Sequence, residues 1–327
     1  MIRVTTASRL HFGLLSVAPL SVHEKLPHLR FGGVGLMVNA PGLRLAVQPA
    51  ECWSAEGPLA ERALAFARRF TRSFELETLP PQHILVEHAP PEHSGLGTGT
   101  QLGLAVARAL AIAAGRSELD ALQLARRVGR GERSALGIHG FALGGFLVEA
   151  GKCGSETVAP LVAQMDFPEP WRLVLALPPG PAGLHGMAER KAFEHLETLG
   201  PIALQAEALC RLVLLEMLPA LAQRDVTAFG ESLHEYNARA GEAFAAIQGG
   251  TYASPTVAEV VGFLRREGIR GVGQSSWGPA VFAVTADEDR AGSLVGRLCA
   301  RFPLRPNNVF VTRASNHGAV VEEKREG

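Results

Sequence analysis

The stretch that decides the fold is Pro90-Pro91-Glu92-His93-Ser94-Gly95-Leu96-Gly97-Thr98-Gly99-Thr100-Gln101, a glycine-rich turn that runs directly into a helical pattern. Residues 83–87 before it have the apolar character of a strand, and apolar residues after it recur at helical spacing. Free N–H groups at the start of a helix attract phosphate or diphosphate. Glycines also serve ordinary tight turns, so these residues alone leave a phosphate site and plain turn chemistry equally open.

Two residues of this stretch predict where the helix begins. Thr98 is followed three positions later by Gln101, which is the spacing of a capping box. Such a cap would place Gly95 and Gly97 where the backbone can approach a ligand closely. The candidate phosphate or diphosphate ligands are therefore Ser94, Gly95, Leu96, Gly97, Thr98, Gly99 and Thr100.

The composition restricts the class of protein. A chain of 327 residues predicts one large or two medium domains. With 47% apolar and 20% charged residues, the chain belongs to the globular class. Its 32 basic side chains balance 32 acidic ones, so no general electrostatic field favours nucleic acid or a membrane as a partner. Any anion site must be local.

The cysteines and the apolar stretches indicate the compartment. Cys52, Cys153, Cys210 and Cys299 form no C-x-x-C pair, which argues against a structural zinc site or a compact disulfide framework. The first residues lack the apolar core of a signal peptide, and the apolar stretch 209–221 is interrupted by charges. We expect a cytoplasmic protein that does not span a membrane.

The rest of the chain predicts an α+β protein. Strands are expected over 2–8 and 10–15, and helices over 59–70 and 117–128. The segment between the first strands, which contains Arg30, is either a substrate-covering loop or a surface excursion. Beyond a boundary placed between Gly151 and Trp171, the pattern suits helices on one face of an antiparallel sheet.

A second glycine-rich stretch covers residues 129–145 and contains charged and histidine side chains. Glu132 could hold a divalent metal or act as a base, and Arg133 could pair with a carboxylate or phosphate. The alternative is that Glu132 and Arg133 form a solvated pair and that His139 is a satisfied loop histidine.

A third turn lies at residues 271–279. The hydroxyl and N–H groups of Ser275 and Ser276 could face the first turn across a cleft. The alternative is a hairpin corner with Trp277 packed against it.

Taken together, these stretches resemble the GHMP kinase superfamily. Pro91-x-x-x-Gly95-Leu96-Gly97-Thr98 resembles its phosphate loop, and the 271–276 turn matches its third motif in kind and place. The resemblance implies a two-domain α+β fold, with a GHMP-type N-terminal domain at 1–160 that is similar to ribosomal protein S5 domain 2. A ferredoxin-like C-terminal domain is expected at 161–327.

A narrower resemblance connects the chain to the β-ribofuranosylaminobenzene 5′-phosphate synthases within that superfamily. It rests on Arg9-Leu10-His11-Phe12-Gly13-Leu14, on Phe31-Gly32-Gly33-Val34-Gly35, on the segment from Arg133 to Phe146, and on residues 273–279. It implies that 4-aminobenzoate condenses with phosphoribosyl diphosphate, releasing CO₂ and diphosphate, for tetrahydromethanopterin biosynthesis. ATP is not expected, Mg²⁺ would be bridged by the substrate, and the protein would be a cytoplasmic homodimer. The alternative is an ATP-dependent small-molecule kinase of the superfamily.

The resemblance also implies roles for particular residues. His11, Arg133 and His139 are the catalytic candidates, and Glu132 is the metal candidate. The substrate-binding candidates are Arg9, Arg30, Gly273, Gln274, Ser275 and Ser276. Two departures weaken a kinase reading: Gly99 stands where many such kinases have a second hydroxyl residue, and Gly137-Ile138-His139 stands where many have a catalytic Asp.

Overall fold

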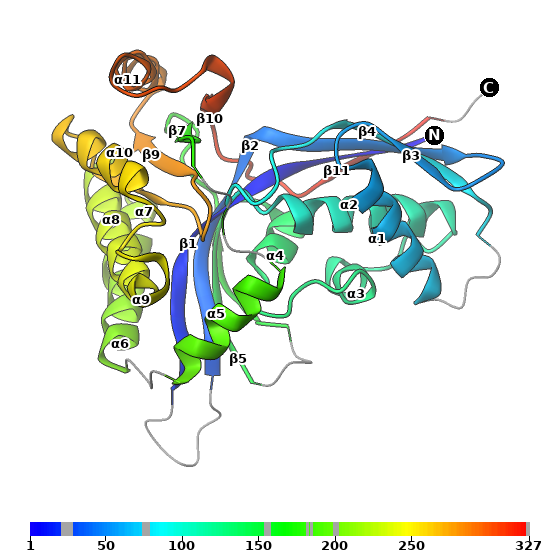
Figure 1. The fold of residues 1–327 in the computed structure, drawn as a ribbon, viewed down its shortest axis with the longest axis horizontal. Helices are drawn as coiled ribbons and strands as arrows, with labels where there is room; N and C mark the ends of the chain where they lie inside the picture. Colours follow the sequence, from blue (N-terminus) through cyan, green and yellow to red (C-terminus); the bar gives the residue numbers. More distant parts are fainter. Residues whose placement is uncertain are drawn as a thin grey trace.

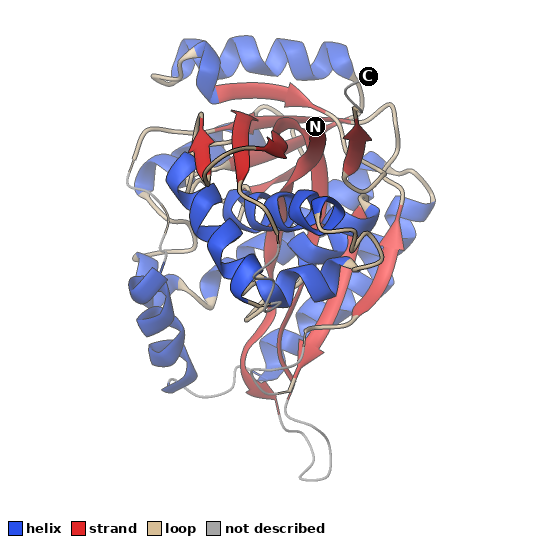
Figure 2. Cartoon of the chain, turned by 90° about the vertical axis from the view of Figure 1, so that its right-hand side faces the viewer, coloured by secondary structure: helices blue, strands red, loops and turns tan. Residues whose placement is uncertain are grey.

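A computed structural model describes residues 1–20, 29–73, 79–153, 158–180, 183, 186–198 and 203–324. The described residues form two antiparallel-rich sheets with helices packed on them (Figures 1 and 2). This architecture confirms the α+β class. Among these residues, no helix has both the length and the apolar character needed to cross a bilayer.

Within the described residues, the first sheet has seven strands and is built around two long ones. Its path runs β11-β1-β2-β4-β3, while β5 pairs with β2 and β6 pairs with β5. The strands are β1 (Ile2–Leu20), β2 (Leu29–Pro49), β3 (Ser54–Glu56), β4 (Gln82–His88), β5 (Phe146–Lys152), β6 (Leu161–Met165) and β11 (Val320–Glu323). Because β6 and β11 come from the second half of the chain, membership of this sheet does not follow the expected division at residue 160.

The expected strands 2–8 and 10–15 form the single strand β1, which pairs with β2 through several shifts in register. One shift lies between His11 and Gly13, at the part of the strand that borders the cavity described below. Much of the segment expected as a substrate-covering loop is strand, since β2 begins at Leu29 and includes Arg30. The remainder of that loop, 21–28, lies outside the described residues.

Four helices cover one face of the first sheet (Figure 1). They are α1 (Ala60–Arg72), α2 (Thr98–Ala113), α3 (Ala121–Arg127) and α4 (Leu136–Leu143). Their apolar sides form one core with β1, β2 and β4, in which α2 is buried along most of its length. The expected helix 59–70 corresponds to α1. The expected helix 117–128 corresponds to α3, which begins later than expected because Asp120 is its N-cap.

The capping box expected at Thr98 and Gln101 is wrong. Gly97, in the left-handed conformation, is the N-cap of α2, and no side chain caps this helix end. Thr98 instead donates its hydroxyl to Pro91 O, and Gln101 donates to Gly137 O. A capping box is instead observed at the N-terminus of α3, between Asp120 and Gln123.

The second sheet contains four strands in the order β10-β7-β9-β8, as far as the chain is described. They are β7 (Arg172–Ala176), β8 (Gly271–Gln274), β9 (Val281–Thr285) and β10 (Val309–Thr312). The helices of this half are α5 (Gly186–Thr198), α6 (Ala203–Leu212), the π-helical turn η1 (Val213–Met217), α7 (Leu218–Ala222), α8 (Val226–Glu242), α9 (Ala245–Gln248), α10 (Pro255–Arg266) and α11 (Glu288–Arg301), with a 3₁₀ turn η2 at Pro306–Asn308.

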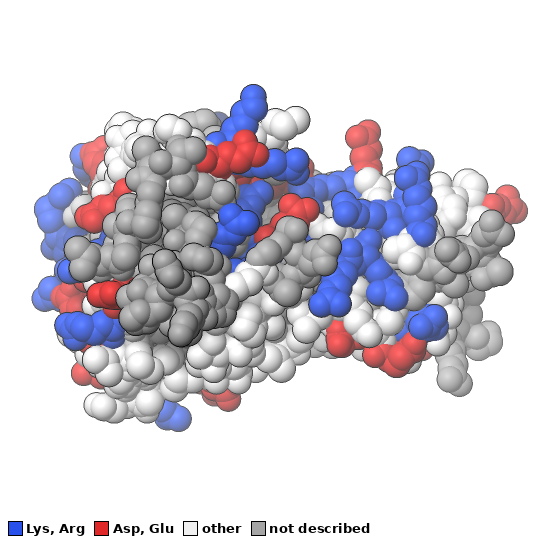
Figure 3. Space-filling view, turned by 90° about the horizontal axis from the view of Figure 1, so that it is seen from below, with Lys and Arg blue, Asp and Glu red and all other residues white. Residues whose placement is uncertain are grey.

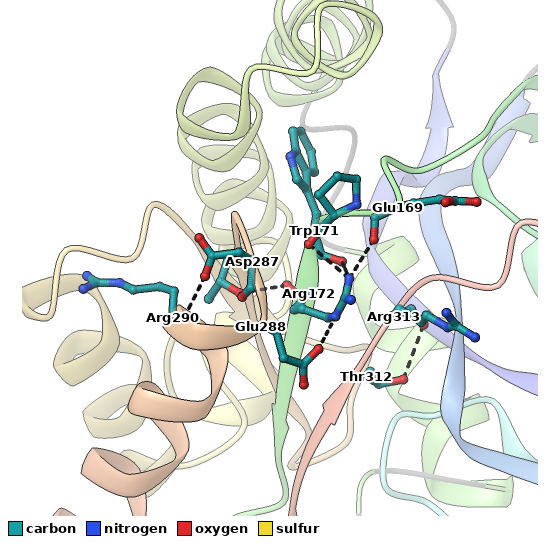
Figure 4. A network of polar contacts seen from close by, with 10 residues as sticks. Glu169, Trp171, Arg172, Asp287, Glu288, Arg290, Thr312 and Arg313 are labelled. Atoms are coloured by element: carbon teal, nitrogen blue, oxygen red, sulfur yellow. Dashed lines mark hydrogen bonds and ion pairs between the residues drawn. The ribbon is translucent and has the colours of Figure 1, made fainter.

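One polar network at the edge of this sheet connects β7 to the start of α11 (Figure 4). Arg172 forms an ion pair with Glu288 and donates to the carbonyl oxygens of Glu169, Pro170 and Trp171. Its residues do not line the cavity, so the network's contribution is structural.

The two halves meet where the first and third glycine turns pack backbone against backbone. A Cβ atom at Gly95 would collide with Ser275 O, and one at Gly278 would collide with the backbone of Ser94. The Ser275 hydroxyl donates to Gly95 O (2.7 Å) and accepts from His11 N (3.0 Å). The cleft expected between these turns is therefore closed at Gly95 and Ser275.

Replacing Gly278 with alanine tests this contact. We expect Gly278→Ala to lower the free energy of unfolding by about 1–3 kcal/mol or more, because the neighbouring backbone cannot yield as a side chain would. Urea denaturation measures the change. The matched control is Gly292→Ala on α11, where no atom lies within 4 Å of an added Cβ. The control should gain about 0.5–1 kcal/mol from helix propensity. Equal effects in the two variants would contradict the close packing.

Candidate active site

A cavity of about 460 Å³ lies between the two halves, beside the contact of the glycine turns. Its walls come from β1, from the loop at residues 128–134, from α5 and α8, and from the turn that follows β8. A volume of this size is typical of small-molecule sites. The charged residues of its wall are Arg9, Arg69, Arg130, Glu132, Arg133, Glu189 and Arg190.

One part of the wall, the basic side, consists of Arg69, Arg130 and Thr100 together with Phe66. The Arg130 guanidinium lies over the Phe66 ring at 4.9 Å from the centroid. Burial, together with the nearby charges of Arg62 and Arg69, lowers the pKa of Arg130 to about 10. Positive charge is thus concentrated here although the whole chain is neutral. Figure 3 shows Lys and Arg side chains gathered on the face seen from below.

Another part of the wall, the aromatic side, consists of Phe193, Phe244 and Trp277. Their ring centroids lie 4.6–6.0 Å apart with nearly perpendicular planes. Arg133 lies over the Phe193 ring at 4.7 Å and forms a 2.7 Å ion pair with Glu189. The pairing of Arg133 with Glu189 leaves this side less positive than the basic side.

His11 lies in β1 and is almost completely buried in the cavity wall. Burial lowers its pKa well below the usual value, and the Arg9 charge adds to the effect. Its Nδ1 accepts a hydrogen bond from Gly13 N (3.2 Å), so the proton of the neutral ring is on Nε2. At neutral pH the imidazole therefore carries no charge, and its Nε2–H is a hydrogen-bond donor.

Arg9 and the buried carboxylate of Glu149 set the local field behind the cavity wall. Nε and Nη1 of Arg9 are buried and have no hydrogen-bond partner among the described residues. Burial lowers the Arg9 pKa to about 10, although the charges of Glu149 and Glu189 oppose this shift. Glu149, on β5, is fully buried and accepts a 2.6 Å hydrogen bond from Ala135 N.

Glu149 and Lys152 attach the charged loop of the cavity to β5. Lys152 donates to Gly131 O (2.8 Å), and Glu149 binds Ala135 N and the Ser134 hydroxyl. The residues between these anchors include Glu132 and Arg133. Burial raises the pKa of Glu149 to about 7, against the hydrogen bonds and the Arg9 charge, which lower it.

The two serines of the third turn were predicted to have the same role, but they have different surroundings. Ser275 is fully buried, and its hydroxyl is occupied by the backbone of Gly95 and His11. It therefore joins segments and does not face the cavity. Ser276 lines the cavity in a left-handed conformation, with its N–H bonded to His11 O (2.9 Å). Gln274 also lines the cavity, but its side chain is bonded to Ala253 N and Ser276 O, while Gly273 is buried outside the wall.

The structure divides the other expected site residues. Arg9, His11, Thr100, Glu132 and Arg133 line the cavity, whereas Arg30 and His139 do not. His139 donates from Nε2 to Ala159 O (2.9 Å), which corresponds to the alternative of a satisfied histidine. In the first turn, Ser94, Leu96 and Thr98 are buried, and Gly95, Gly97, Gly99 and Thr100 remain partly exposed.

Several cavity residues were missed by the sequence reasoning. They are Arg69, Arg130, Arg190, Phe193, Asn237, Phe244 and Trp277, together with Glu149 behind the wall. One signal was present for the basic side, because Arg62, Phe66 and Arg69 are spaced to share a face of α1. The aromatic residues lie on segments far apart in sequence and gave no comparable signal.

The serines provide a paired test. Ser275→Ala removes the hydroxyl that bonds both Gly95 O and His11 N, and it leaves these two buried backbone groups without a partner. We therefore expect a loss of about 2–4 kcal/mol in the free energy of unfolding. Ser276→Ala should change stability by no more than about 0.5 kcal/mol, and it should raise the KM for a cavity ligand. Urea denaturation and steady-state kinetics measure the two effects. Equal stability losses would contradict the division of roles.

Glu149 predicts a pH dependence of stability. Its folded pKa is raised to about 7, so the native state binds the proton more tightly than the unfolded chain does. The protonated Glu149 side chain therefore contributes to the free energy of unfolding. This contribution is fully present below about pH 4.5 and is lost as pH rises through 7, by an amount on the order of 3 kcal/mol. Urea denaturation at pH 5 and pH 7.5 should show a smaller loss for Glu149→Gln than for the wild type. The exposed Glu132→Gln should behave as the wild type, and an unchanged slope for Glu149→Gln would refute the assignment.

Comparison with known proteins places this geometry in a family. The GHMP kinases N terminal domain matches residues 59–145, and the GHMP kinases C terminal domain matches residues 217–304. A putative homoserine kinase from Listeria monocytogenes superposes with a TM-score of 0.67 at 16% identity, covering 99% of this chain and 100% of that one. The mevalonate kinase of L. major superposes with a TM-score of 0.69 at 13% identity, covering 97% of this chain and 96% of that one. These likenesses show the fold alone.

Two relatives are more similar in sequence. The β-ribofuranosylphenol 5′-phosphate synthase of Methanothermobacter thermautotrophicus is 32% identical over 341 residues, covering 97% of this chain and 98% of that protein. The protein of the same name from Archaeoglobus fulgidus is 29% identical, covering 98% and 100%. With the two-domain match and near-complete coverage at this identity, the chain belongs to the β-ribofuranosylphenol 5′-phosphate synthase family of the GHMP kinase superfamily.

Proposed function

We propose that the chain catalyses the decarboxylating condensation of a 4-substituted benzoate with phosphoribosyl diphosphate. The products are a β-ribofuranosyl arene 5′-phosphate, CO₂ and diphosphate. The observation that carries the proposal is a single cavity with an aromatic side and a basic side. An aromatic nucleophile and a polyanionic leaving group require those two environments next to each other. Family membership supports the same reaction class.

The identity of the 4-substituent is a specific part of the proposal. The resemblance found in the sequence implies 4-aminobenzoate, whereas the name of the relatives specifies a phenol product. Either an amino or a hydroxyl group can donate its lone pair to the ring carbon that bears the carboxylate. We propose 4-aminobenzoate as the substrate and treat 4-hydroxybenzoate as the competing candidate.

The proposed reaction balances without an external acid or base. The bond from ribose C1 to the diphosphate oxygen breaks, and C1 bonds to the ring carbon that carries the carboxylate. The bond from that carbon to the carboxylate then breaks, CO₂ leaves, and its electron pair restores the aromatic ring. A neutral His11 suits this sequence, because the cavity needs an oriented donor near the reacting atoms and no proton acceptor.

The charged residues would act on the two substrates in different ways. Arg9 carries partly unsatisfied N–H groups and borders the cavity, so it can hold an anionic group of either substrate. Arg133 is placed by its contacts with Phe193 and Glu189, and it can orient the benzoate. Ser276 can add a hydroxyl contact from the second half of the chain.

A magnesium ion fits this site only as part of the substrate. Among the described residues, no group of three or more His, Cys, Asp or Glu side chains is arranged to hold a metal. Mg²⁺ is commonly held by one or two carboxylates plus substrate phosphates, and it neutralises phosphate charge. Glu132, an exposed carboxylate in the cavity wall, is the residue that we propose would contact it. The proposal also includes a cytoplasmic homodimer, as the family resemblance implies.

An isotope assay tests the reaction. The protein is incubated with Mg²⁺, phosphoribosyl diphosphate and carboxyl-labelled 4-aminobenzoate or 4-hydroxybenzoate, and released CO₂ and diphosphate are measured. We expect equal amounts of the two products, with 4-aminobenzoate preferred. Preference for 4-hydroxybenzoate would correct the substrate and keep the reaction. No release from either, together with ADP formation from ATP and a small alcohol, would replace the proposal with the kinase alternative.

A further inference from the structure

Two arginines, Arg62 and Arg130, meet beside Gly99 in the first turn of α2, and Arg69 lies with Arg130 in the cavity wall. Arg62 and Arg69 come from α1, and Arg130 comes from the loop after α3. The guanidinium groups of Arg62 and Arg130 both lie over the Phe66 ring, at 5.8 and 4.9 Å from its centroid. Phe66 therefore acts as a shared platform that keeps two like charges near each other.

Gly99 provides the space that these arginines occupy. A Cβ atom at Gly99 would collide with Nη2 of Arg62 and would lie 3.4 Å from Nη2 of Arg130. A hydroxyl residue at this position would displace Arg62 from the helix start. The absence of a side chain at Gly99 thus allows guanidinium groups to lie at the N-terminus of α2, where the helix dipole already favours an anion.

The positive charge at this place is incompletely neutralised. Arg62 forms an ion pair with Glu92, but Arg69 and Arg130 have no ion pair with any carboxylate of the described residues. Nε of Arg130 is buried without a partner in the described part of the chain, as are Nε and Nη1 of Arg9, which packs against Gly97 in the same turn. Buried donors without partners and clustered like charges indicate the place of an anion.

Building on the proposed function, we infer that Arg69 and Arg130 bind the diphosphate of phosphoribosyl diphosphate beside the first turn of α2. Arg62 lies outside the cavity wall and is paired with Glu92. The diphosphate carries the largest negative charge of the two substrates, and this is the part of the cavity with the most unpaired positive charge. The aromatic side is less suitable because Glu189 neutralises Arg133. As the C1–O bond breaks, the departing oxygen gains negative charge, and the fixed guanidinium groups stabilise that charge.

The glycine turn itself offers few side-chain groups to the diphosphate. The hydroxyls of Ser94 and Thr98 both donate to Pro91 O, so they stabilise the turn and are not available to a ligand without rearrangement. Ligand contact would come from the partly exposed residues Gly97, Gly99 and Thr100, and from arginines outside the motif. The turn shapes the site, and the arginines supply most of its charge.

Isothermal titration of the full chain with inorganic diphosphate tests the inference without turnover. We expect Arg130→Gln and Arg69→Gln each to raise the Kd for diphosphate about tenfold or more, because each removes a charged hydrogen-bond donor. Arg69 is exposed, so its variant should fold even if Arg130→Gln does not. The matched control is Arg72→Gln, an exposed arginine of α1 outside the cavity wall, and its Kd should equal that of the wild type. A wild-type Kd in Arg69→Gln and in a folded Arg130→Gln overturns the inference.

Ribose 5-phosphate separates the two anionic ends of the substrate. If the arginines bind the diphosphate end, Arg130→Gln and Arg69→Gln should weaken ribose 5-phosphate binding much less than diphosphate binding. An equal or larger loss for ribose 5-phosphate would overturn the assignment.

Turnover separates this inference from the proposed function. If the wild type binds diphosphate through these arginines but releases no CO₂, the proposed function fails and the anion site stands. If the wild type releases CO₂ and Arg130→Gln and Arg69→Gln keep the wild-type KM for phosphoribosyl diphosphate, the anion assignment fails and the function stands.

Discussion

The architecture of the site depends on the contact between the two glycine turns, in which backbone groups of both halves are taken out of water together. Ser275 makes this contact possible because one hydroxyl both donates to Gly95 O and accepts from His11 N. A small side chain with both functions satisfies two buried backbone groups at once. The contact holds β1 against the second half, and it thereby fixes where His11 meets the cavity.

Helix α8 strengthens the same junction from the other side. Asn237 donates to Phe12 O and Gln274 O and accepts from Gln274 N, while the buried Tyr236 hydroxyl donates to Gly13 O. These bonds connect β1, β8 and α8 through side chains that are buried. Such a network defines positions closely, because any shift would leave a polar group without a partner. The cavity wall is consequently built on regular elements of both sheets.

The superfamily fold supports several chemistries, and in this chain the site has its own charge pattern. Solved kinases share the fold at 13–16% identity, which leaves the chemistry to be argued from the site. Here the positive charge near α2 comes from guanidinium groups, and the histidine of the cavity wall, His11, is neutral. Both features suit the loss of a diphosphate and of CO₂ more than they suit the transfer of a phosphoryl group.

The sequence by itself determined the α+β class, the superfamily and the position of the first turn, because strand and helix periodicity and glycine spacing are local properties. It also identified Arg9, His11 and Arg133, which lie within the motifs that carry the resemblance and which line the cavity. Only the tertiary structure decided that Ser275 bonds backbone groups of both halves whereas Ser276 lines the cavity. It also decided that His139 bonds to a carbonyl oxygen and that Gly97 is the N-cap of α2. It also decided that Arg62 from α1 meets Arg130 over the Phe66 ring. These outcomes depend on which groups are brought together from distant segments and on which hydrogen bonds burial leaves unsatisfied, and neither is a local property of the chain.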